Sequence, residues 1–305
     1  MSTRDMPPRA WAELGLLSLI WGASFLSVRI ALDEVPVLTS VAWRVGVAAV
    51  VLWLAVLIRG LPVPRDPRVW GAMLVMGFLN NVIPFSLMAW GQLHISSGLT
   101  SILNSGTAVF GVLVAALMLS DERLTARRAA GVSIGFLGVA TAIGLDNLTS
   151  FDLRSAAQLA VVGGTISYAF AGVWARTRLP GLTPQMSAAG MLTGSALVMI
   201  PAALLIDGPV VPHQADTILA IGYYAVIATA FAYLLYFRVL AMAGSGNTML
   251  VTLLVAPTAI LLGAWARDEV LSHNVYAGFG LLALGLIVLD GRLLRRLRGV
   301  ATPRT

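Results

Sequence analysis

The sequence predicts an all-α integral membrane protein with ten transmembrane helices, arranged as two five-helix repeats of inverted topology. Three observations predict this fold class: the composition, the number of long apolar stretches and an internal repeat. Of the 305 residues, 58% are hydrophobic and 11% are charged, and the mean hydropathy is +0.86. An average soluble domain has roughly 25% charged residues. We therefore expect most of the chain to lie in a lipid bilayer.

The sequence also excludes several classes of function. It contains no cysteine, which excludes disulfides, thiolate nucleophiles and cysteine-ligated metal centres. The net charge of +6 comes from short arginine clusters beside apolar stretches, so we expect no nucleic-acid partner. No Walker A motif and no Asp-rich pair for Mg²⁺ occurs. We expect neither an ATP-driven pump nor an enzyme, and no cofactor or metal.

Five apolar stretches of about 20 residues occupy the first half, residues 1–150. The first follows a polar start with Arg4 and Arg9. It is too long for the apolar part of a typical signal peptide, so we expect an uncleaved helix. Prolines such as Pro36, Pro62 and Pro67 separate the next stretches, as suits turns and helix starts. The predicted helices are 11–31, 37–58, 69–91, 97–119 and 127–145.

The second half, residues 151–305, contains five further stretches and an arginine-rich tail. Pro180, Gly181, Pro209 and Pro212 lie in the short connections between them. The predicted helices are 155–175, 184–206, 217–240, 246–266 and 274–292. No long linker or soluble domain remains.

An internal repeat relates the two halves at a constant offset of 147 residues. Asp121-Glu122-x-Leu124 recurs as Asp268-Glu269-x-Leu271, and Ala130-Gly131 recurs as Ala277-Gly278. Five helices are an odd number, so the duplicated half crosses the membrane in the opposite direction and the repeat becomes inverted. The acidic pair occurs in both copies. We therefore expect it to cap the starts of the following helices rather than to bind cargo.

The arginines predict the orientation. Ten spans place both termini and four of the nine loops on one side, and sixteen of the twenty arginines fall there. Because cytoplasmic loops collect Lys and Arg, we expect this side, with both termini, to be cytoplasmic.

Polar and aromatic side chains within the predicted spans indicate a pathway for a substrate, because polar groups facing lipid are costly. The alternative is that small polar residues hold helices together by interhelical hydrogen bonds worth roughly 0.6 to 2 kcal/mol. The candidate pathway residues are Trp21, Arg44, Asn80, Asn81, Ser101, Asn104, Ser105, Tyr168, Trp174, Thr229, Tyr233, Tyr236, Asn247 and Thr252.

Three further positions have two interpretations each. Pro84 and Pro257 remove a backbone hydrogen bond in mid-span, which frees a carbonyl for gating or only kinks the helix. His94, at the outer end of its span, either couples transport to protons or is an ordinary interfacial histidine. By contrast, Gly131 with Gly135 and Gly190 with Gly194 are small-xxx-small pairs that predict helix packing faces.

Arg44 is the one charged residue predicted inside the membrane, about eight residues from the outer end of its span. An ionisable residue there indicates function, and a substrate carboxylate is the matching ligand. The alternative is that Arg44 reaches the outer interface or pairs with Asp33 or Glu34. No Asp or Glu lies near mid-membrane, so facilitated export or exchange is favoured over tight proton antiport.

These motifs resemble the EamA-type drug/metabolite transporter superfamily over essentially the whole chain. The resemblance rests on Ile20-Trp21-Gly22-Ala23-Ser24-Phe25, on Trp43-Arg44 and on Asp-Glu-x-Leu after the fourth and ninth spans. It implies a bacterial inner-membrane exporter with cytoplasmic termini and a central cavity between spans 1–4 and 6–9. The chain departs from the usual pattern at Phe110, which matches Pro257 in the other half, so we expect a proline-broken helix only in the second half.

The expected function is an alternating-access secondary carrier that exports small metabolites, with hydrophobic, aromatic or neutral amino acids as the favoured cargo. The partners expected are the small-molecule substrate and the lipid bilayer, with a homodimer as one possible assembly. The alternatives are a channel-like facilitator and an exporter of other metabolites or drugs.

Overall fold

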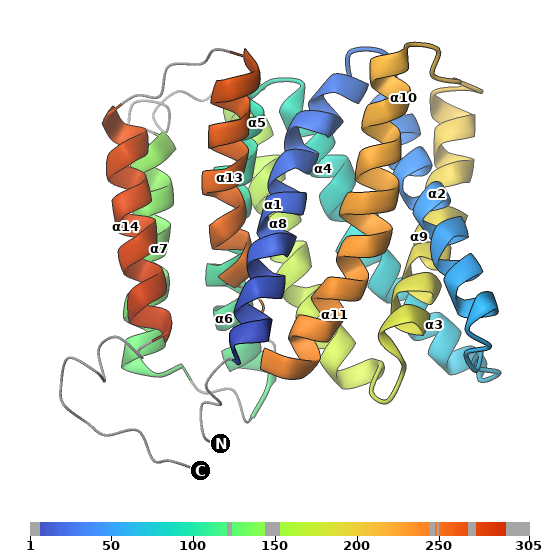
Figure 1. Cartoon of the computed structure of the whole chain (residues 1–305), viewed down its shortest axis with the longest axis horizontal. Coiled ribbons are helices and arrows are strands. Elements are labelled where there is room, and N and C mark those ends of the chain that lie inside the picture. The colour runs from blue at the N-terminus through green and yellow to red at the C-terminus, as the bar shows by residue number, and fades with distance from the viewer. Residues whose placement is uncertain are drawn as a thin grey trace.

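A computed structural model describes residues 7–120, 124–143, 153–243, 248, 250–267 and 273–290. All the regular secondary structure of these residues is helical, which confirms the predicted all-α class. The helices stand side by side as a bundle, with α7 and α14 at one edge and α2, α3 and α9 at the other (Figure 1).

The first half consists of seven α-helices and one π-helical segment. Proline begins α1 and α3, and the side chains of Asp66 and Ser96 cap α3 and α5 by accepting backbone N–H groups. The elements are α1 (Pro8–Ala31), α2 (Val37–Ile58), α3 (Pro67–Gly77), η1 (Phe78–Val82), α4 (Ile83–Gln92), α5 (Ser97–Asn104), α6 (Gly106–Met118) and α7 (Ala126–Ile143).

The second half repeats this order. Pro184 begins α9, and the side chain of Thr183 caps it. The elements are α8 (Leu153–Arg178), α9 (Pro184–Ile206), α10 (Ala215–Gly222), η3 (Tyr223–Phe231), α11 (Ala232–Ala243), α13 (Leu250–Arg267) and α14 (His273–Asp290).

Seven helical stretches within the described residues are long and apolar enough to cross a membrane: Pro8–Ala31, Val37–Ile58, Pro67–Gln92, Ser97–Met118, Ala156–Arg178, Pro184–Ile206 and Ala215–Ala243. Two shorter apolar helices, Leu254–Ala266 and Tyr276–Gly285, accompany them. The count of ten spans therefore stays a prediction. The predicted ranges 37–58 and 184–206 coincide with α2 and α9.

The helix bounds follow the 147-residue offset of the sequence. Helix α9 begins 147 positions after α2, since 184 minus 37 gives 147, and the described parts of α7 and α14 stand at the same offset. The members of both pairs pack against each other. Both Asp-Glu segments lie outside the described residues, so their predicted capping role stays a prediction.

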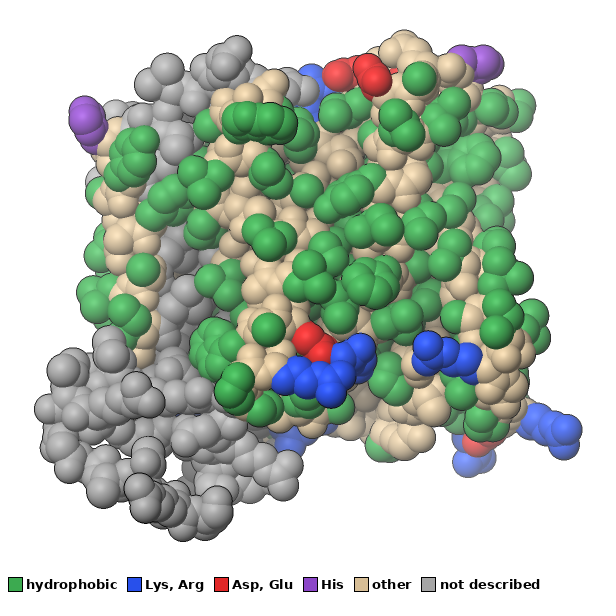
Figure 2. Space-filling view, in the orientation of Figure 1, with side chains coloured by type: hydrophobic (Ala, Val, Ile, Leu, Met, Phe, Trp, Pro, Cys, Tyr) green, Lys and Arg blue, Asp and Glu red, His purple; other side chains and the backbone are tan. Residues whose placement is uncertain are grey.

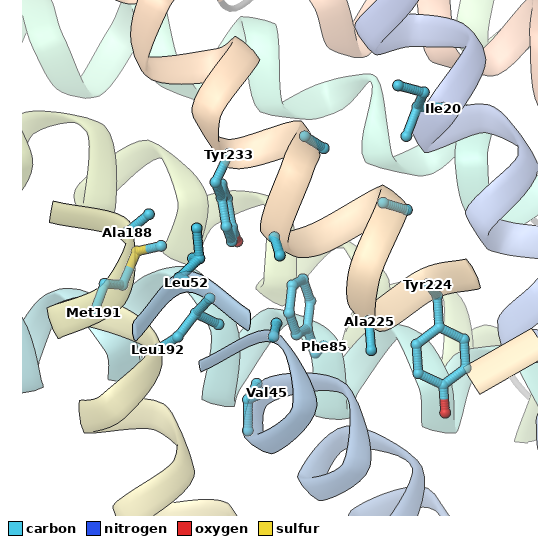
Figure 3. Packing of buried hydrophobic residues seen from close by; sticks show 14 of the residues in the cluster. Ile20, Val45, Leu52, Phe85, Ala188, Met191, Leu192, Tyr224, Ala225 and Tyr233 are labelled. Carbon is cyan, nitrogen blue, oxygen red and sulfur yellow. The ribbon is translucent and has the colours of Figure 1, made fainter. Parts of the chain in front are cut away.

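Glycines allow the closest helix contacts, as the small-xxx-small pairs predicted. A Cβ at Gly190 would collide with Met73, and one at Gly194 would lie 2.7 Å from the Cα of Leu74, so α9 and α3 are in backbone contact there. A Cβ at Gly285 would lie 2.6 Å from the backbone nitrogen of Gly135, which brings α14 equally close to α7. Buried apolar side chains from α2, α4, α9 and α11, including Leu52, Phe85, Leu192 and Tyr233, fill the space between the helices (Figure 3).

The expected proline-broken helix is not where the sequence placed it. Helix α13 continues through Pro257 as one helix. The interruption lies instead in the predicted span 97–119, between α5 and α6. There the backbone N–H groups of Ser105 and Ala108 bond to carbonyls three residues earlier, at Ile102 and Ser105, which tightens the helix for one turn.

The turn between α1 and α2 is held by acidic side chains. Asp33 pairs with Arg29 at 2.7 Å, and Glu34 accepts the backbone N–H groups of His213 and Gln214 ahead of α10. Arg44 therefore pairs with neither carboxylate, which removes one of the alternatives left open for it. Hydrogen bonds from the Thr217 side chain and from the backbone of His213 lower the pKa of Glu34.

We expect this contact to make the turn between α1 and α2 pH-dependent. Because the pKa of Glu34 is lowered on folding, its contribution to stability is complete above the unfolded-state value of about 4.5 and is lost as the pH falls through the lower folded-state pKa. Glu34→Gln should therefore flatten the fall of the unfolding temperature as the pH drops below about 4.5. An equal fall in the variant and the wild type would contradict the assignment.

Candidate functional site

A central cavity opens among the helices, with an empty volume of about 900 Å³ that includes space open to solvent. Its walls come from both halves of the chain and are mainly apolar or aromatic, with a few polar groups. The lining residues are Trp21, Ser24, Phe25, Val28, Arg44, Asn80, Phe85, Met88, Ala89, Gln92, Asn104, Thr107, Tyr168, Ala228, Tyr233, Tyr236, Val251, Thr252 and Val255.

Arg44 is the only charged residue among those lining residues. Its Nε donates to the hydroxyl of Thr229 at 2.9 Å, and its guanidinium carbon lies 3.7 Å from the centre of the Phe85 ring. The Tyr224 ring is 5.8 Å away. No carboxylate among the described residues pairs with it. The fixed and stacked guanidinium thus presents an uncompensated positive charge to the cavity, suited to a carboxylate.

Aromatic rings surround the same space. The Trp21 ring lies 5.9 Å from Tyr236 and 6.5 Å from Tyr233, measured between centroids. The indole N–H of Trp21 donates to the carbonyl of Ala228 at 2.9 Å, which fixes the orientation of the ring. Tyr168, at the position 147 residues after Trp21, lines the cavity from α8. These rings can hold an apolar or aromatic side chain of a ligand.

A buried hydrogen-bond chain supports Tyr233. Its hydroxyl donates to Oδ1 of Asn81 at 2.5 Å and accepts from Nδ2 of Asn80 at 2.9 Å. Nδ2 of Asn81 in turn donates to the hydroxyl of Ser195 on α9 at 2.8 Å. Asn81 is fully buried. The chain therefore links the cavity wall to the packing of α9.

We expect Tyr233→Phe to lower the free energy of unfolding by about 1–3 kcal/mol, because it leaves the buried Oδ1 of Asn81 with only the 3.4 Å contact to Asn80. Tyr236→Phe is the matched control, since the hydroxyl of Tyr236 makes no hydrogen bond among the described residues. Thermal unfolding of the purified variants in detergent measures the difference. Equal unfolding temperatures would show that the chain contributes nothing to stability.

Two π-helical segments widen the helices beside the cavity. Segment η1 ends at Val82, two residues before Pro84, whose missing N–H and ring prevent a regular α-helical bond. Segment η3 contains the positions 147 residues after η1 but has no proline. There the hydroxyl of Thr229 donates to the carbonyl of Tyr224 five residues earlier. The indole N–H of Trp21 donates to the carbonyl of Ala228. Both segments thus leave carbonyls available to side chains.

The structure brings eight of the fourteen candidate pathway residues to the cavity wall: Trp21, Arg44, Asn80, Asn104, Tyr168, Tyr233, Tyr236 and Thr252. Five others lie outside the lining and make structural hydrogen bonds to a helix or to a lining residue: Asn81, Ser101, Ser105, Trp174 and Thr229. Asn247 lies outside the described residues. The small-polar alternative thus describes Asn81, Ser105 and Thr229, which bond to other helices, whereas Ser101 bonds within its own helix and Trp174 is not a small residue.

The remaining predicted positions lie away from the lining. Pro84 is buried and packs beside Gly164 of α8, and Pro257 lies within α13. His94 is in the turn between α4 and α5, where its ring contacts Trp90 edge-on at 5.0 Å. Among the described residues, no group of three or more His, Asp or Glu side chains could hold a metal ion.

The chain matches the model of the EamA-like transporter family twice, over residues 11–144 and 155–289. The chain belongs to the EamA-like transporter family. Similar EamA-like proteins include the probable terminal-alkyne amino-acid exporter of Streptantibioticus cattleyicolor, 26% identical over 96% of this chain and 97% of that protein. The probable amino-acid metabolite efflux pump of Escherichia coli K12 is 23% identical over 90% of this chain and 92% of its own length.

A solved crystal structure shares the fold of this EamA-like chain. It matches with a TM-score of 0.72 at 19% sequence identity, over 94% of this chain and 98% of that chain. The two family matches fall one in each half of the sequence.

Sequence reasoning missed the apolar residues that α4 contributes to the lining of this EamA-like site. Phe85, Met88, Ala89 and Gln92 follow one another at i, i+3, i+4 and i+7, so they form one face of α4 that borders the cavity. An apolar face of that kind also suits contact with lipid or with another helix. The one polar member, Gln92, was the signal that could have identified this face.

Proposed function

We propose that the protein is a secondary, alternating-access carrier of a bacterial inner membrane that exports small metabolites, with hydrophobic, aromatic or neutral amino acids as its favoured cargo. The observation that carries this proposal is the uncompensated Arg44 inside a cavity walled by Trp21, Tyr168, Tyr233 and Tyr236. The guanidinium matches a carboxylate, and the rings match an apolar side chain.

Alternating access requires two halves that rock about a central site, and an inverted repeat provides them. Contacts between equivalent positions support this arrangement. The hydroxyl of Ser105 donates to the carbonyl of Thr252, which is the position 147 residues later, at 3.0 Å. Helices α7 and α14, whose described parts stand at the same offset, also pack together. A helix that contacts the equivalent helix of the other half must lie close to the symmetry axis between the two halves. The proposed ten-span inverted repeat requires such an axis.

The distribution of charge supports cytoplasmic termini. On the face seen in Figure 2, most arginines gather at the end of the bundle where α1 begins, whereas histidine side chains lie at the opposite end and acidic side chains occur at both ends. Arg9 and Arg238, both paired with Glu13, lie at the first end, and the described end of α14 returns to it (Figure 1). The positive-inside rule assigns that end to the cytoplasm.

The names of the relatives support the class of cargo, since two of them are described as an amino-acid exporter and an amino-acid metabolite efflux pump. The residues around the cavity provide a physical basis for such a cargo. Among the described lining residues no carboxylate lies beside Arg44, so a zwitterion can neutralise the site without displacing an internal ion pair.

The test is flux through the purified full-length chain in proteoliposomes. We expect saturable counterflow of radiolabelled phenylalanine, tyrosine or leucine, with little change when a pH gradient is imposed. Liposomes without protein are the control. Absence of saturable flux for every amino acid tried would contradict the proposed cargo, and unitary currents in planar bilayers would identify a channel instead.

A further inference from the structure

Gln92 is a buried amide in the cavity wall that lacks a partner. It ends α4, its side chain lines the cavity, and it is 3% exposed. Its Oε1 accepts no hydrogen bond from the part of the chain that the structure describes. Nearly all buried polar atoms in proteins are hydrogen bonded, so such an atom calls for a ligand or a water that satisfies it.

The position of Gln92 relative to Arg44 determines what that ligand can be. Gln92 lies seven residues beyond Phe85 on the same face of α4, which is a rise of about 10 Å. The guanidinium of Arg44 stacks on the ring of Phe85. The intervening residues on this face, Met88 and Ala89, are apolar. The wall therefore runs from a cation, past an apolar stretch, to a single amide.

We propose that Gln92 is a specificity-determining residue that binds a hydrogen-bonding group at the far end of the cargo side chain. The inference rests on the proposed function and names the cargo more closely: an aromatic amino acid whose ring carries a polar group at its tip, such as a phenol hydroxyl. Its carboxylate contacts Arg44, its ring lies against Phe85 and Met88, and its hydroxyl donates to Oε1 of Gln92.

The separation excludes the α-ammonium group as the partner of Gln92. The ammonium and carboxylate of an α-amino acid are attached to the same carbon, so both lie close to Arg44. A group about two helical turns away along α4 belongs to the other end of the molecule. Asn104 and Tyr168 also line the cavity, and their side chains are available to contact the ammonium group.

The experiment compares the KM for tyrosine with that for phenylalanine in proteoliposomes of the full chain. Wild-type protein should favour tyrosine. Gln92→Met preserves the length and flexibility of the side chain and removes the amide. It should raise the KM for tyrosine about three- to tenfold, the factor expected for one neutral hydrogen bond, and leave phenylalanine unchanged. Leu87→Met, on the same helix but outside the cavity lining and packed beside Gly163 of α8, should leave the ratio of the two KM values at its wild-type value.

Two outcomes would overturn the inference, and they differ in what else they affect. If Gln92→Met transports both amino acids but shifts their KM values equally, Gln92 does not bind the distal group, and the proposed function stands. If wild-type protein transports neither amino acid while calorimetry detects no binding of either, the inference fails together with the proposed cargo. Size-exclusion chromatography of each variant verifies that it is folded.

Discussion

We expect Arg44→Gln to raise the KM for carboxylate-bearing cargo about 10- to 100-fold. A hydrogen bond to a charged partner contributes about 1.5–3 kcal/mol, and each 1.4 kcal/mol corresponds to a factor of ten. Gln keeps a polar side chain within the span but removes the positive charge and the stacking on Phe85. Arg44→Lys, which keeps the charge but not the planar group that stacks and bonds Thr229, should show an intermediate loss.

Two comparisons separate carboxylate binding from a structural role. Arg29→Gln changes an arginine in the last turn of α1, where Arg29 pairs with Asp33, and should leave the KM unchanged. An amine analogue of the cargo that lacks the carboxylate should bind Arg44→Gln protein at least as well as wild-type protein, because the variant no longer presents a positive charge to the ammonium group. If flux of the amine and of the amino acid falls by the same factor in Arg44→Gln, Arg44 maintains the structure of the cavity and does not bind the carboxylate.

The sequence was most informative about long-range order along the chain. Apolar length and proline punctuation located α2 and α9 to the residue or nearly so, because lipid thickness fixes the length of a span. The 147-residue offset related α7 to α14 before any contact was known. Such patterns depend only on local composition and on duplication, both of which a single sequence records.

The sequence was less informative about which polar groups face the cavity. Asn80 and Asn81 are neighbours, yet one lines the cavity and the other bonds to Ser195 behind it. Adjacent residues of a helix point about 100° apart, and only the tertiary contacts decide which direction is occupied by a neighbour. The partner of Arg44 was likewise unpredictable, since Thr229 is 185 positions away.

The helix distortions show the same limit. Pro84 signals η1, because proline cannot donate a backbone hydrogen bond, but no residue type signals η3. There the distortion accompanies a local bond from Thr229 to the carbonyl of Tyr224 and a tertiary bond from Trp21 to the carbonyl of Ala228. The interruption at Ser105 is also accompanied by such a bond, to Thr252. Each of these hydrogen bonds lies at or beside the cavity. There side-chain hydrogen bonds replace regular helical ones, and they differ between the two halves of the chain.

We expect Gly77→Ala to lower the free energy of unfolding by about 1–3 kcal/mol or more, whereas Gly71→Ala on the same helix should raise it. A Cβ at Gly77 would collide with the carbonyl oxygen of Met191 and lie 2.8 Å from the hydroxyl and 2.9 Å from the nitrogen of Ser195. Two of these atoms are backbone, so α3 and α9 must separate to admit it. Separation would also stretch the bond from Asn81 to Ser195.

Gly71 provides a matched control because a Cβ there meets nothing within 4 Å. Alanine at an open helical position stabilises the helix by about 0.8–1 kcal/mol relative to glycine, so the same substitution six residues apart should have opposite signs. Thermal unfolding of both variants in detergent measures the two shifts. If Gly77→Ala is as stable as Gly71→Ala, α3 and α9 are not in backbone contact there, and the support of Tyr233 through Asn81 and Ser195 must be assigned differently.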